Sequence, residues 1–312
     1  VSMRKHWASA VVLLFLLTGC LNIHTNIGTP SPKPEGGKEA VSPPKKDGTP
    51  PKKSMEEILA DATVASGLFT TYTKKDHLYW EITPEHLAKR YLLLGTLARG
   101  IGVAGFQGGS TRGSFVFELR NVPGDRIEIA KVNYRFKATP GSPEERSTKH
   151  AVSTSLFASL PIVAENPQTK GWIVDLQEQF ISDFADTAGQ LQRILQGEYR
   201  LDAPSSRIEF AKVFPKNIEI SVLQHFLGFK GGWQIVLPDT KNIEVLMRYS
   251  ISELDTTGYR PRLADDRVGY FITEIKNFSS DDPRDNIERL IFRWRLEKKD
   301  PSAPLSPPVK PI

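Results

Sequence analysis

Apolar and polar residues alternate along most of this chain, and a period of two is typical of β-strands that bury one face. Only two or three segments carry a helical period instead. About ten alternating segments among so few helices predict a mainly β, antiparallel β-sandwich or barrel-like fold with two or three short helices. The alternation is clearest in Leu78–Ile82, Phe115–Leu119, Ile127–Ile129, Trp172–Leu176, Ile208–Phe210, Ile218–Val222, Trp233–Leu237, Ile243–Ile251 and Leu290–Leu296.

Two details of this pattern predict side-chain directions. The alternation slips by one residue between Ile129 and Val132, which predicts a β-bulge near Ala130. The last alternating segment predicts a strand with one apolar and one basic face. Its inward residues are expected to be Leu290, Phe292, Trp294 and Leu296, and its outward residues Arg289, Arg293 and Arg295.

Helix signals occur in three places. Ser54 with Glu57 has the spacing of a capping box, and the helix that follows is expected to end at Gly67. Thr83 and Pro84 mark the start of a second helix, reaching to Arg90. Gln177–Gln196 is a third candidate, interrupted at Gly189.

The N-terminus has the layout of an export signal, with Arg4 and Lys5 before a short apolar stretch, Ala8–Leu17. A stretch of about ten residues is too short to cross a bilayer as a helix. It ends in Leu17-Thr18-Gly19-Cys20, which resembles the lipobox of bacterial lipoproteins, although an ordinary signal with a chance cysteine is the alternative. The resemblance implies lipidation of Cys20. The absence of an acidic residue just after Cys20 then favours the outer membrane of a Gram-negative bacterium.

Composition divides the rest of the chain. Residues 21–53 contain seven prolines and six lysines, which predicts a disordered linker after the signal peptide 1–20. Residues 1–53 hold 8 basic and 3 acidic residues, so the remaining 33 basic and 33 acidic residues balance from Ser54 onward. A neutral body predicts no nucleic-acid partner. We expect one mainly β domain over 54–297 and a proline-rich exit linker over 298–312.

The sequence contains one match to a cofactor-binding motif and four isolated histidines in its folded part. Gly100–Gly105 matches the dinucleotide fingerprint, but the glycines that follow it disfavour a helix, so a mobile loop between strands is expected. His77, His86, His150 and His225 form no His-Glu-x-x-His motif, and no Gly-x-Ser-x-Gly is present. We therefore predict no catalytic and no metal-binding residue in this chain.

The most distinctive polar segment is Tyr259–Phe271, in which arginines and aspartates are dense. It is either a solvated loop with local Arg–Asp pairs, or a loop whose guanidinium groups contact a partner domain or a peptide carboxylate. The candidate contact residues are Arg260, Arg262, Asp265, Arg267 and Tyr270.

Several segments together resemble the N-terminal DUF5117-type region of large bacterial zinc-dependent metalloproteases with a metzincin-like catalytic domain. The similarity covers roughly residues 54–312. The segments are Gly67–Phe69, Leu78–Ile82, Phe214–Glu219, Arg260–Arg262, Asp265–Phe271, Arg293–Pro301 and Pro308–Ile312. In that family the zinc motif lies downstream of the Lys-Pro-Ile run. The resemblance therefore implies zinc only in a downstream catalytic domain, and no cofactor in this chain.

The resemblance implies a non-catalytic module of a membrane-anchored, zinc-metallopeptidase-like lipoprotein. Such a module would scaffold, gate or present substrate to a metallopeptidase domain, in cis or in trans. Its partners would be the membrane, through the lipid anchor, that catalytic domain, and a peptide substrate. The chain is then either a truncated product or separate reading frame, or a module that works alone. The alternative is a stand-alone envelope lipoprotein that binds peptide or glycan, and whether the chain is itself an enzyme is left undecided.

Overall fold

The computed structural model describes residues 54–309 except 104, 231–233, 235, 255–257, 283–284 and 295. The signal peptide, the linker and Cys20 lie outside these residues, as do Trp233, Ile235 and Arg295. Of the described residues, 45% are in strands and 14% in helices, which confirms the predicted mainly β class. Among the described residues, no helix has the length and apolar character needed to cross a bilayer.

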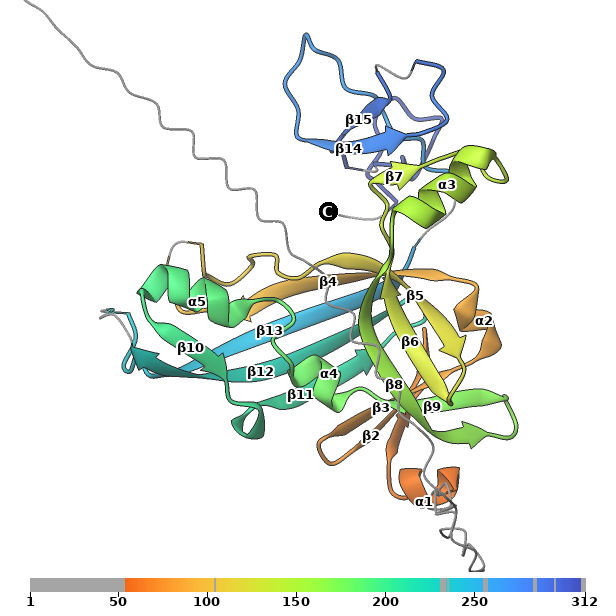
Figure 1. Cartoon of the computed structure of the whole chain (residues 1–312). Helices are drawn as coiled ribbons and strands as arrows, with labels where there is room; N and C mark the ends of the chain where they lie inside the picture. The colour runs from red at the N-terminus through yellow and green to blue at the C-terminus, as the bar shows by residue number, and fades with distance from the viewer. Residues whose placement is uncertain are drawn as a thin grey trace, which may run out of the picture. The chain divides into compact units, whose positions relative to one another are not determined.

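The main body is a twelve-stranded antiparallel sheet that curls into a nearly closed barrel (Figure 1). This settles the choice between barrel and sandwich. The strand order is β1-β2-β3-β9-β8-β6-β5-β4-β13-β12-β10, and β11 also pairs with β12. The strands are β1 (Thr63–Ala65), β2 (Thr70–Lys74), β3 (His77–Ile82), β4 (Arg90–Arg99), β5 (Phe115–Val122), β6 (Arg126–Lys131), β8 (Ser155–Asn166), β9 (Gly171–Asp175), β10 (Glu198–Leu201), β11 (Arg207–Val213), β12 (Asn217–Lys230) and β13 (Asn242–Glu253).

The barrel interior follows the predicted alternation. The inward residues of β12 and β13, such as Ile220 and Met247, are fully buried. On the other side of the core, the Phe69 ring stacks on Trp80 at 4.7 Å between centroids. Ring pairs with offset geometry contribute stability beyond the area they bury.

β3 departs from simple alternation, because Leu78 to Ile82 are all buried. Tyr79 belongs to a second small core with Tyr72 and Ile173, on which Met55 and Ile58 pack. The first helix therefore packs on the outward face of β3 and helps to bury it.

The described part of the chain has five short α-helices rather than two or three, and one 3₁₀ turn, Ala203–Ser205. The helices are α1 (Met55–Leu59), α2 (Pro84–Leu87), α3 (Pro143–Ala151), α4 (Gln177–Ile181) and α5 (Thr187–Leu195). The Ser54–Glu57 capping box is confirmed, but α1 ends at Leu59 instead of Gly67. Its C-cap, Ala60, is already non-helical, and Asp61, which follows, has a φ of 61°, so the chain turns into β1.

The third predicted helix is two helices, broken at 182–186 and not at Gly189. Asp183 causes the second one to begin, because its carboxylate accepts hydrogen bonds from the N–H groups of Thr187 (2.7 Å) and Ala188 (2.9 Å). The core side of α4 and α5 carries Phe180 and Leu191, both buried in the main cluster.

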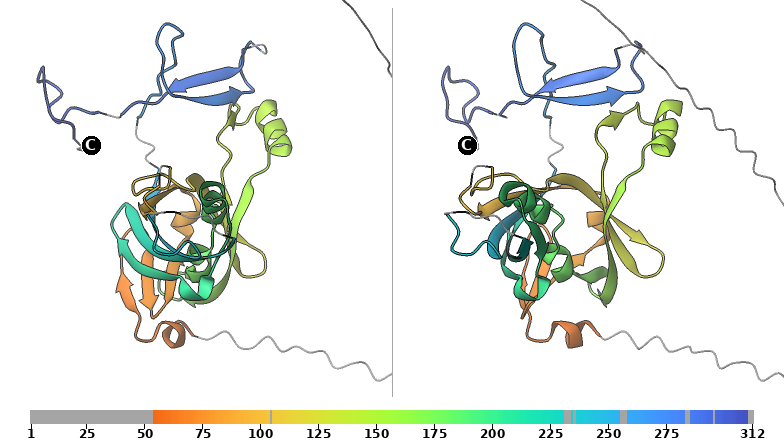
Figure 2. Two further views of the ribbon diagram at one scale, coloured as in Figure 1. Left: turned by 90° about the vertical axis from the view of Figure 1, so that its left-hand side faces the viewer. Right: turned by 60° about the vertical axis from the view of Figure 1, so that its left-hand side comes forward.

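The predicted bulge is confirmed, because the pairing of β6 with β8 shifts register between Ile129 and Ala130. The alternation of Val132, Tyr134 and Phe136 predicts that this strand continues beyond the bulge, and that prediction is wrong. β6 ends at Lys131, and the chain next forms the two-residue strand β7 (Phe136–Lys137) in a separate three-stranded sheet (Figure 2). That sheet has the order β15-β14-β7, with β14 (Ile272–Asn277) and β15 (Ile287–Ile291) antiparallel and β7 parallel to β14.

The prediction for the last strand is also wrong. β15 stops at Ile291, and the side chains of Phe292, Trp294 and Leu296 are 65%, 71% and 57% exposed. The physical reason is a missing partner strand. Ile272, the first residue of β14, pairs with Ile291, and only the Phe292 N–H bond to Phe271 O (2.8 Å) extends the ladder further.

Candidate functional site

The histidines lie apart and in different kinds of contact. Within the described part of the chain, no group of three or more His, Cys, Asp or Glu residues could hold a metal ion. His77 forms a half-exposed pair with Asp175 (Nδ1–Oδ2 2.5 Å), and His150 lies exposed on α3. The other two, His86 and His225, are more enclosed.

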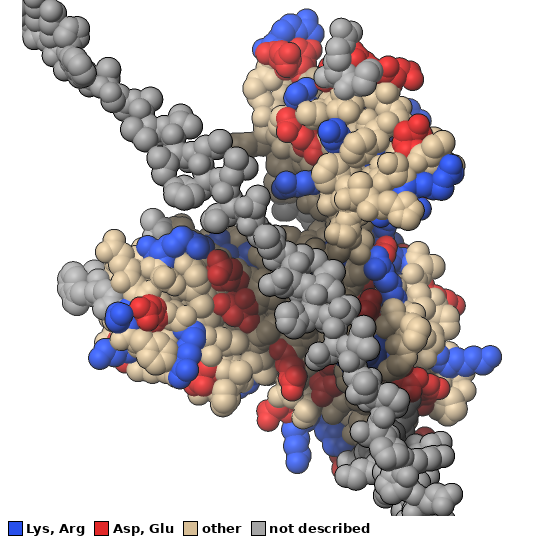
Figure 3. Space-filling model, in the orientation of Figure 1, with Lys and Arg blue, Asp and Glu red and all other residues tan. Residues whose placement is uncertain are grey.

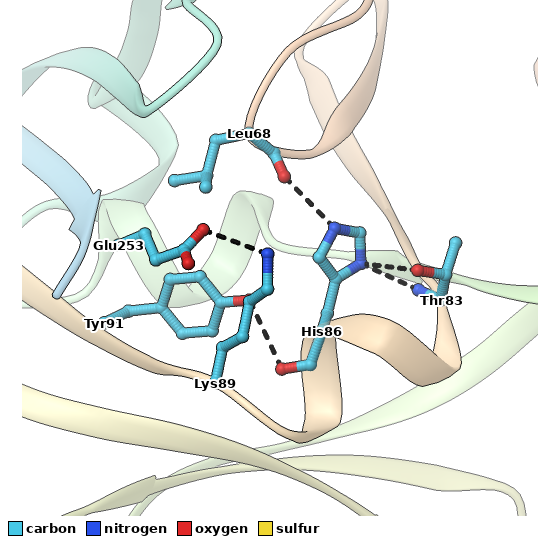
Figure 4. A network of polar contacts seen from close by, with 6 residues as sticks. All are labelled: Leu68, Thr83, His86, Lys89, Tyr91 and Glu253. Atoms are coloured by element: carbon cyan, nitrogen blue, oxygen red, sulfur yellow. Dashed lines mark hydrogen bonds and ion pairs between the residues drawn. The ribbon is translucent and has the colours of Figure 1, made fainter. Parts of the chain in front are cut away.

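His86 lies at the centre of a polar network that joins α2 to the segment before β2 (Figure 4). Its Nδ1 accepts the Thr83 backbone N–H at 2.9 Å, so its Nε2 carries the proton and donates to the Leu68 carbonyl at 3.1 Å. Burial lowers the pKa of His86, and the ring packs 4.6 Å from that of Phe69. The ring is neutral and both of its nitrogens form hydrogen bonds, so His86 has a structural role and holds α2 to the segment before β2.

The rest of this network is also structural. The Tyr91 hydroxyl donates to the His86 carbonyl at 3.2 Å, and the Lys89 ammonium pairs with Glu253 at 3.1 Å (Figure 4). Burial, and then the charge of Glu253, raise the pKa of Tyr91. These contacts link α2 to the ends of β4 and β13.

His225 and Asp202 form the arrangement closest to a catalytic pair, with Nδ1 and Oδ2 3.3 Å apart. They adjoin a cavity of about 400 Å³ lined by His225, Arg99 and Glu244. The hydrogen bond from Ser205, and then His225, lower the pKa of Asp202. The neighbouring Ser206 hydroxyl accepts the His225 backbone N–H (2.9 Å) and donates to the Asp202 carbonyl (2.8 Å). The Ser206 hydroxyl is hydrogen-bonded to two backbone groups and not to the His225 imidazole. It therefore lacks the hydrogen bond to a base that activates a serine nucleophile.

Glu81 is a buried carboxylate, only 3% exposed. It accepts hydrogen bonds from the Tyr72 hydroxyl (2.7 Å), the Asn166 amide (3.0 Å) and the Thr169 hydroxyl. Burial, and then Glu81, raise the pKa of Tyr72. This cluster ties the β8–β9 turn to β2 and β3, and it explains how a carboxylate is tolerated there.

The glycine segment forms a loop between the strands β4 and β5, as predicted, and backbone hydrogen bonds hold it. Ile101 N–H bonds to Phe106 O (3.0 Å) and Arg112 N–H to Gly95 O (2.6 Å), and the Phe106 ring is fully buried. The strands that flank it belong to an antiparallel sheet, so the dinucleotide-binding context is absent from these residues, as expected. An exposed aromatic here would have favoured glycan binding, but Phe106 is enclosed.

The predicted contact residues lie in the segment before β14. Asp265 and Arg267 are brought together: the guanidinium donates to both carboxylate oxygens, at 2.9 and 2.6 Å. These hydrogen bonds lower the pKa of Asp265 to about 2. Local Arg–Asp pairing is therefore confirmed for these two residues. A separate backbone hydrogen bond, from Val268 N–H to Asp265 O (3.0 Å), closes the turn at 265–268.

Two of the other three residues, Arg260 and Arg262, have backbone carbonyls bonded to β15 or to the residues just after it. The Arg262 carbonyl accepts the Ile291 N–H (3.0 Å), and the Arg260 carbonyl accepts the Arg293 guanidinium (2.7 Å). The segment 260–264 thus runs along the outer edge of β15. Tyr270 is 42% exposed and lies directly before Phe271.

Large apolar side chains are exposed in the two segments that meet at the end of the β14–β15 ladder. We call them the C-terminal apolar surface: Leu263, Val268, Tyr270, Phe271, Phe292, Trp294 and Leu296, which are 42% to 85% exposed. The hydrogen bond between Phe292 and Phe271 shows that the two chain segments meet at this end. Exposed groups of this size mark interaction sites on soluble proteins.

Sequence patterns identified only part of this surface: Tyr270 is among the predicted contact residues, whereas Phe292, Trp294 and Leu296 are predicted to face inward. Arg293 lies between two members of this surface in the sequence, and its guanidinium lies 5.3 Å from the centroid of the Tyr259 ring. On the face seen in Figure 3, acidic and basic residues are interspersed over the described part of the chain. The distinguishing feature of the C-terminal apolar surface is therefore its exposed aromatic content.

Two family models match the chain, and together they span the barrel and the small sheet. A domain of unknown function, DUF5118, matches residues 52–100, and a second domain of unknown function, DUF5117, matches residues 109–299. No curated protein and no solved structure gives a significant match. Because the second match covers more than half of the 312 residues, this chain belongs to the DUF5117 family.

Proposed function

We propose that this chain is the non-catalytic N-terminal module of a membrane-anchored, zinc-metallopeptidase-like lipoprotein. The module scaffolds, gates or presents substrate to a metallopeptidase domain, supplied in cis or in trans. The zinc belongs to that domain and no cofactor to this chain. Support comes from the resemblance of segments such as Asp265–Phe271 and Arg293–Pro301 to the N-terminal region of such proteases.

The observation that carries this proposal is the C-terminal apolar surface. Phe271 is 85% exposed and Trp294 is 71% exposed, and the guanidinium of Arg293, the residue before Trp294, lies against the Tyr259 ring. Aromatic and arginine side chains dominate the binding energy of protein interfaces, whereas their exposure to water has no stabilising effect on an isolated domain. A folded protein domain is the partner that this chemistry fits.

The cellular location of the module is part of the same proposal. Lipidation of Cys20 would anchor the chain in the outer membrane, and the proline-rich residues 21–53 would space the folded body from the bilayer. We expect no nucleic-acid partner, because acidic and basic residues balance from Ser54 onward.

A binding measurement with the zinc metallopeptidase domain encoded in the same or a neighbouring gene tests the proposal. Phe271→Ala and Trp294→Ala should each weaken binding at least tenfold, in line with about 2 kcal/mol for a truncated hot-spot aromatic. Phe229→Ala is the matched control, because that ring is 56% exposed on β12 and should leave affinity unchanged. Equal effects of all three variants, or zinc-dependent cleavage of casein by this chain alone, would contradict the proposal.

A further inference from the structure

One edge of β14 is open over its first half. On the β15 side, the ladder uses the odd-numbered residues, since Phe271 O accepts from Phe292 N–H (2.8 Å) and Asn277 N–H donates to Asn286 O (2.7 Å). Backbone groups of a strand alternate between its two edges. The even-numbered residues of β14 therefore direct their N–H and C=O groups to the opposite edge.

β7 occupies only the far end of that opposite edge. It pairs with β14 at Lys276 and Asn277, where Lys276 N–H donates to Arg135 O (2.8 Å). Ile272 and Glu274 face the same edge before β7 begins. Among the described residues, none pairs with these two through the backbone on that side.

A groove of about 530 Å³ lies along this open stretch. Its lining includes Ile272, Glu274 and Ile287 from the sheet, and Tyr134, Arg135 and Phe136 from the chain entering β7. The side chains of Ile272 and Ile287 are each 38% exposed, and that of Tyr134 is 53% exposed. The lining also includes Thr273 and Lys276, so the groove offers apolar and charged contacts beside the open edge, together with backbone hydrogen-bonding groups.

From this geometry we propose that the groove binds an extended peptide, which adds to β14 as a further strand beside Ile272–Glu274. Ile272 and Glu274 present an N–H and a C=O each, repeated every two residues, or about 6.7 Å. Only an extended polypeptide backbone carries complementary groups at that repeat, and strand addition is a common mode of peptide recognition. Glu274 is already paired with Arg289 (3.3 Å), so apolar contacts with Ile272 and Tyr134 select the peptide.

This inference deepens the proposed function and rests on it in one respect, namely that the bound peptide is a substrate for the peptidase. Binding itself needs no peptidase. The experiment therefore uses this chain alone, so that a failure of domain docking and a failure of peptide binding give separate results.

The probe is a fluorescein-labelled octapeptide of alternating valine and threonine, titrated into the whole chain and followed by anisotropy. The same peptide with methylated backbone nitrogens keeps the side chains but loses the N–H donors. We expect the first peptide to bind and the methylated one to bind at least tenfold more weakly. Amide hydrogen exchange of the unaltered protein should show Ile272 and Glu274 slowed by the peptide, while Thr273 is already slow without it.

Glu274→Pro removes the N–H that faces the groove and leaves the β15 ladder intact. It should weaken binding about fivefold or more, which is the loss expected for one backbone hydrogen bond. Glu274→Ala keeps the N–H and should bind within twofold of the original. If Glu274→Pro fails to fold, the exchange measurement on the unaltered protein decides whether the peptide pairs with Ile272 and Glu274.

Three results would overturn the inference. One is equal binding of the methylated peptide, and another is unchanged exchange at Ile272 and Glu274 when peptide is bound. The third is protection of these amides that depends on protein concentration without peptide, because a second copy would then occupy the edge.

Discussion

The backbone N–H of Leu68 donates a 2.8 Å hydrogen bond to the carbonyl of Phe214, and this contact joins the segment before β2 to the end of β11. It lies where the curled sheet comes closest to closing on itself. The two residues are 146 positions apart, yet both belong to segments that carry the family resemblance. The barrel is therefore closed at one point by a loop-to-strand contact and not by a full ladder.

Gly67 makes this close approach possible. A Cβ built at Gly67 would lie 2.6 Å from Val213 Cγ1 and would also overlap the Phe214 carbonyl. Gly67→Ala should destabilise the fold by about 1 to 3 kcal/mol, measured as the urea midpoint shift, because a well-packed site must move. Gly269→Ala is the control, since a Cβ there meets nothing within 4 Å, and it should leave the midpoint nearly unchanged. Equal urea midpoints for the two variants would argue against a close contact of Gly67 with Val213 and Phe214.

The two family segments form one folding unit. β1–β4 fall within residues 52–100, and β4 pairs with β5 and β13 from the second segment, as β3 does with β9. Residues 52–100 or 109–299 expressed alone should therefore lack dispersed amide resonances, because Trp80 and Tyr91 would lose their core. Co-expressed 52–100 and 101–312 should associate and recover them. A cooperative unfolding transition in 109–299 alone would show that the segments are separate domains.

Local signals were correctly interpreted where the cause is local. The Ser54–Glu57 capping box and the bulge at Ala130 depend on a few neighbouring residues, and both are confirmed. The start of α2 after Thr83 is confirmed for the same reason, although the helix ends at Leu87 rather than Arg90.

Predictions failed where the outcome depends on a distant partner. Alternation in Leu290–Leu296 cannot reveal that β14 begins only at Ile272, so it predicts buried positions for Phe292 and Trp294, which are exposed. The strand β7 has two residues, too few to show an alternating pattern, and it forms by pairing with Lys276 and Asn277 at the edge of β14. The pairing of Asp265 with Arg267 was among the stated alternatives, because their spacing is short.

Glu81 provides a test of the buried polar cluster. Glu81→Gln leaves one acceptor oxygen for three donors, so at least one hydroxyl or amide loses its partner in the interior. We expect a loss of about 3 kcal/mol of unfolding free energy, by urea denaturation. Glu165→Gln, on an exposed position of β8, should change stability by less than about 0.5 kcal/mol. A neutral effect of Glu81→Gln would show that the carboxylate is not needed in this cluster.

His86 predicts a pH dependence of stability. Burial lowers its pKa in the folded state below the unfolded value of about 6.5, so the unfolded chain binds the proton more readily. Its contribution is thus complete above pH 6.5 and is lost as the pH falls from there towards the folded pKa, with a slope of at most about 1.4 kcal/mol per pH unit. Unfolding free energies between pH 5 and 8 should show this slope flattened in His86→Gln, but not in His150→Gln, whose side chain is exposed. An identical slope in all three proteins would remove His86 as the cause.

The proposed docking of a metallopeptidase domain is tested most directly by mapping the contact through hydrogen exchange of the whole chain, with and without that domain. The account predicts slowed exchange at amides within 259–296, around Phe271, Phe292 and Trp294, and unchanged exchange in β12 and β13. Protection confined to the barrel strands, or no protection at saturating concentrations of the domain, would contradict it.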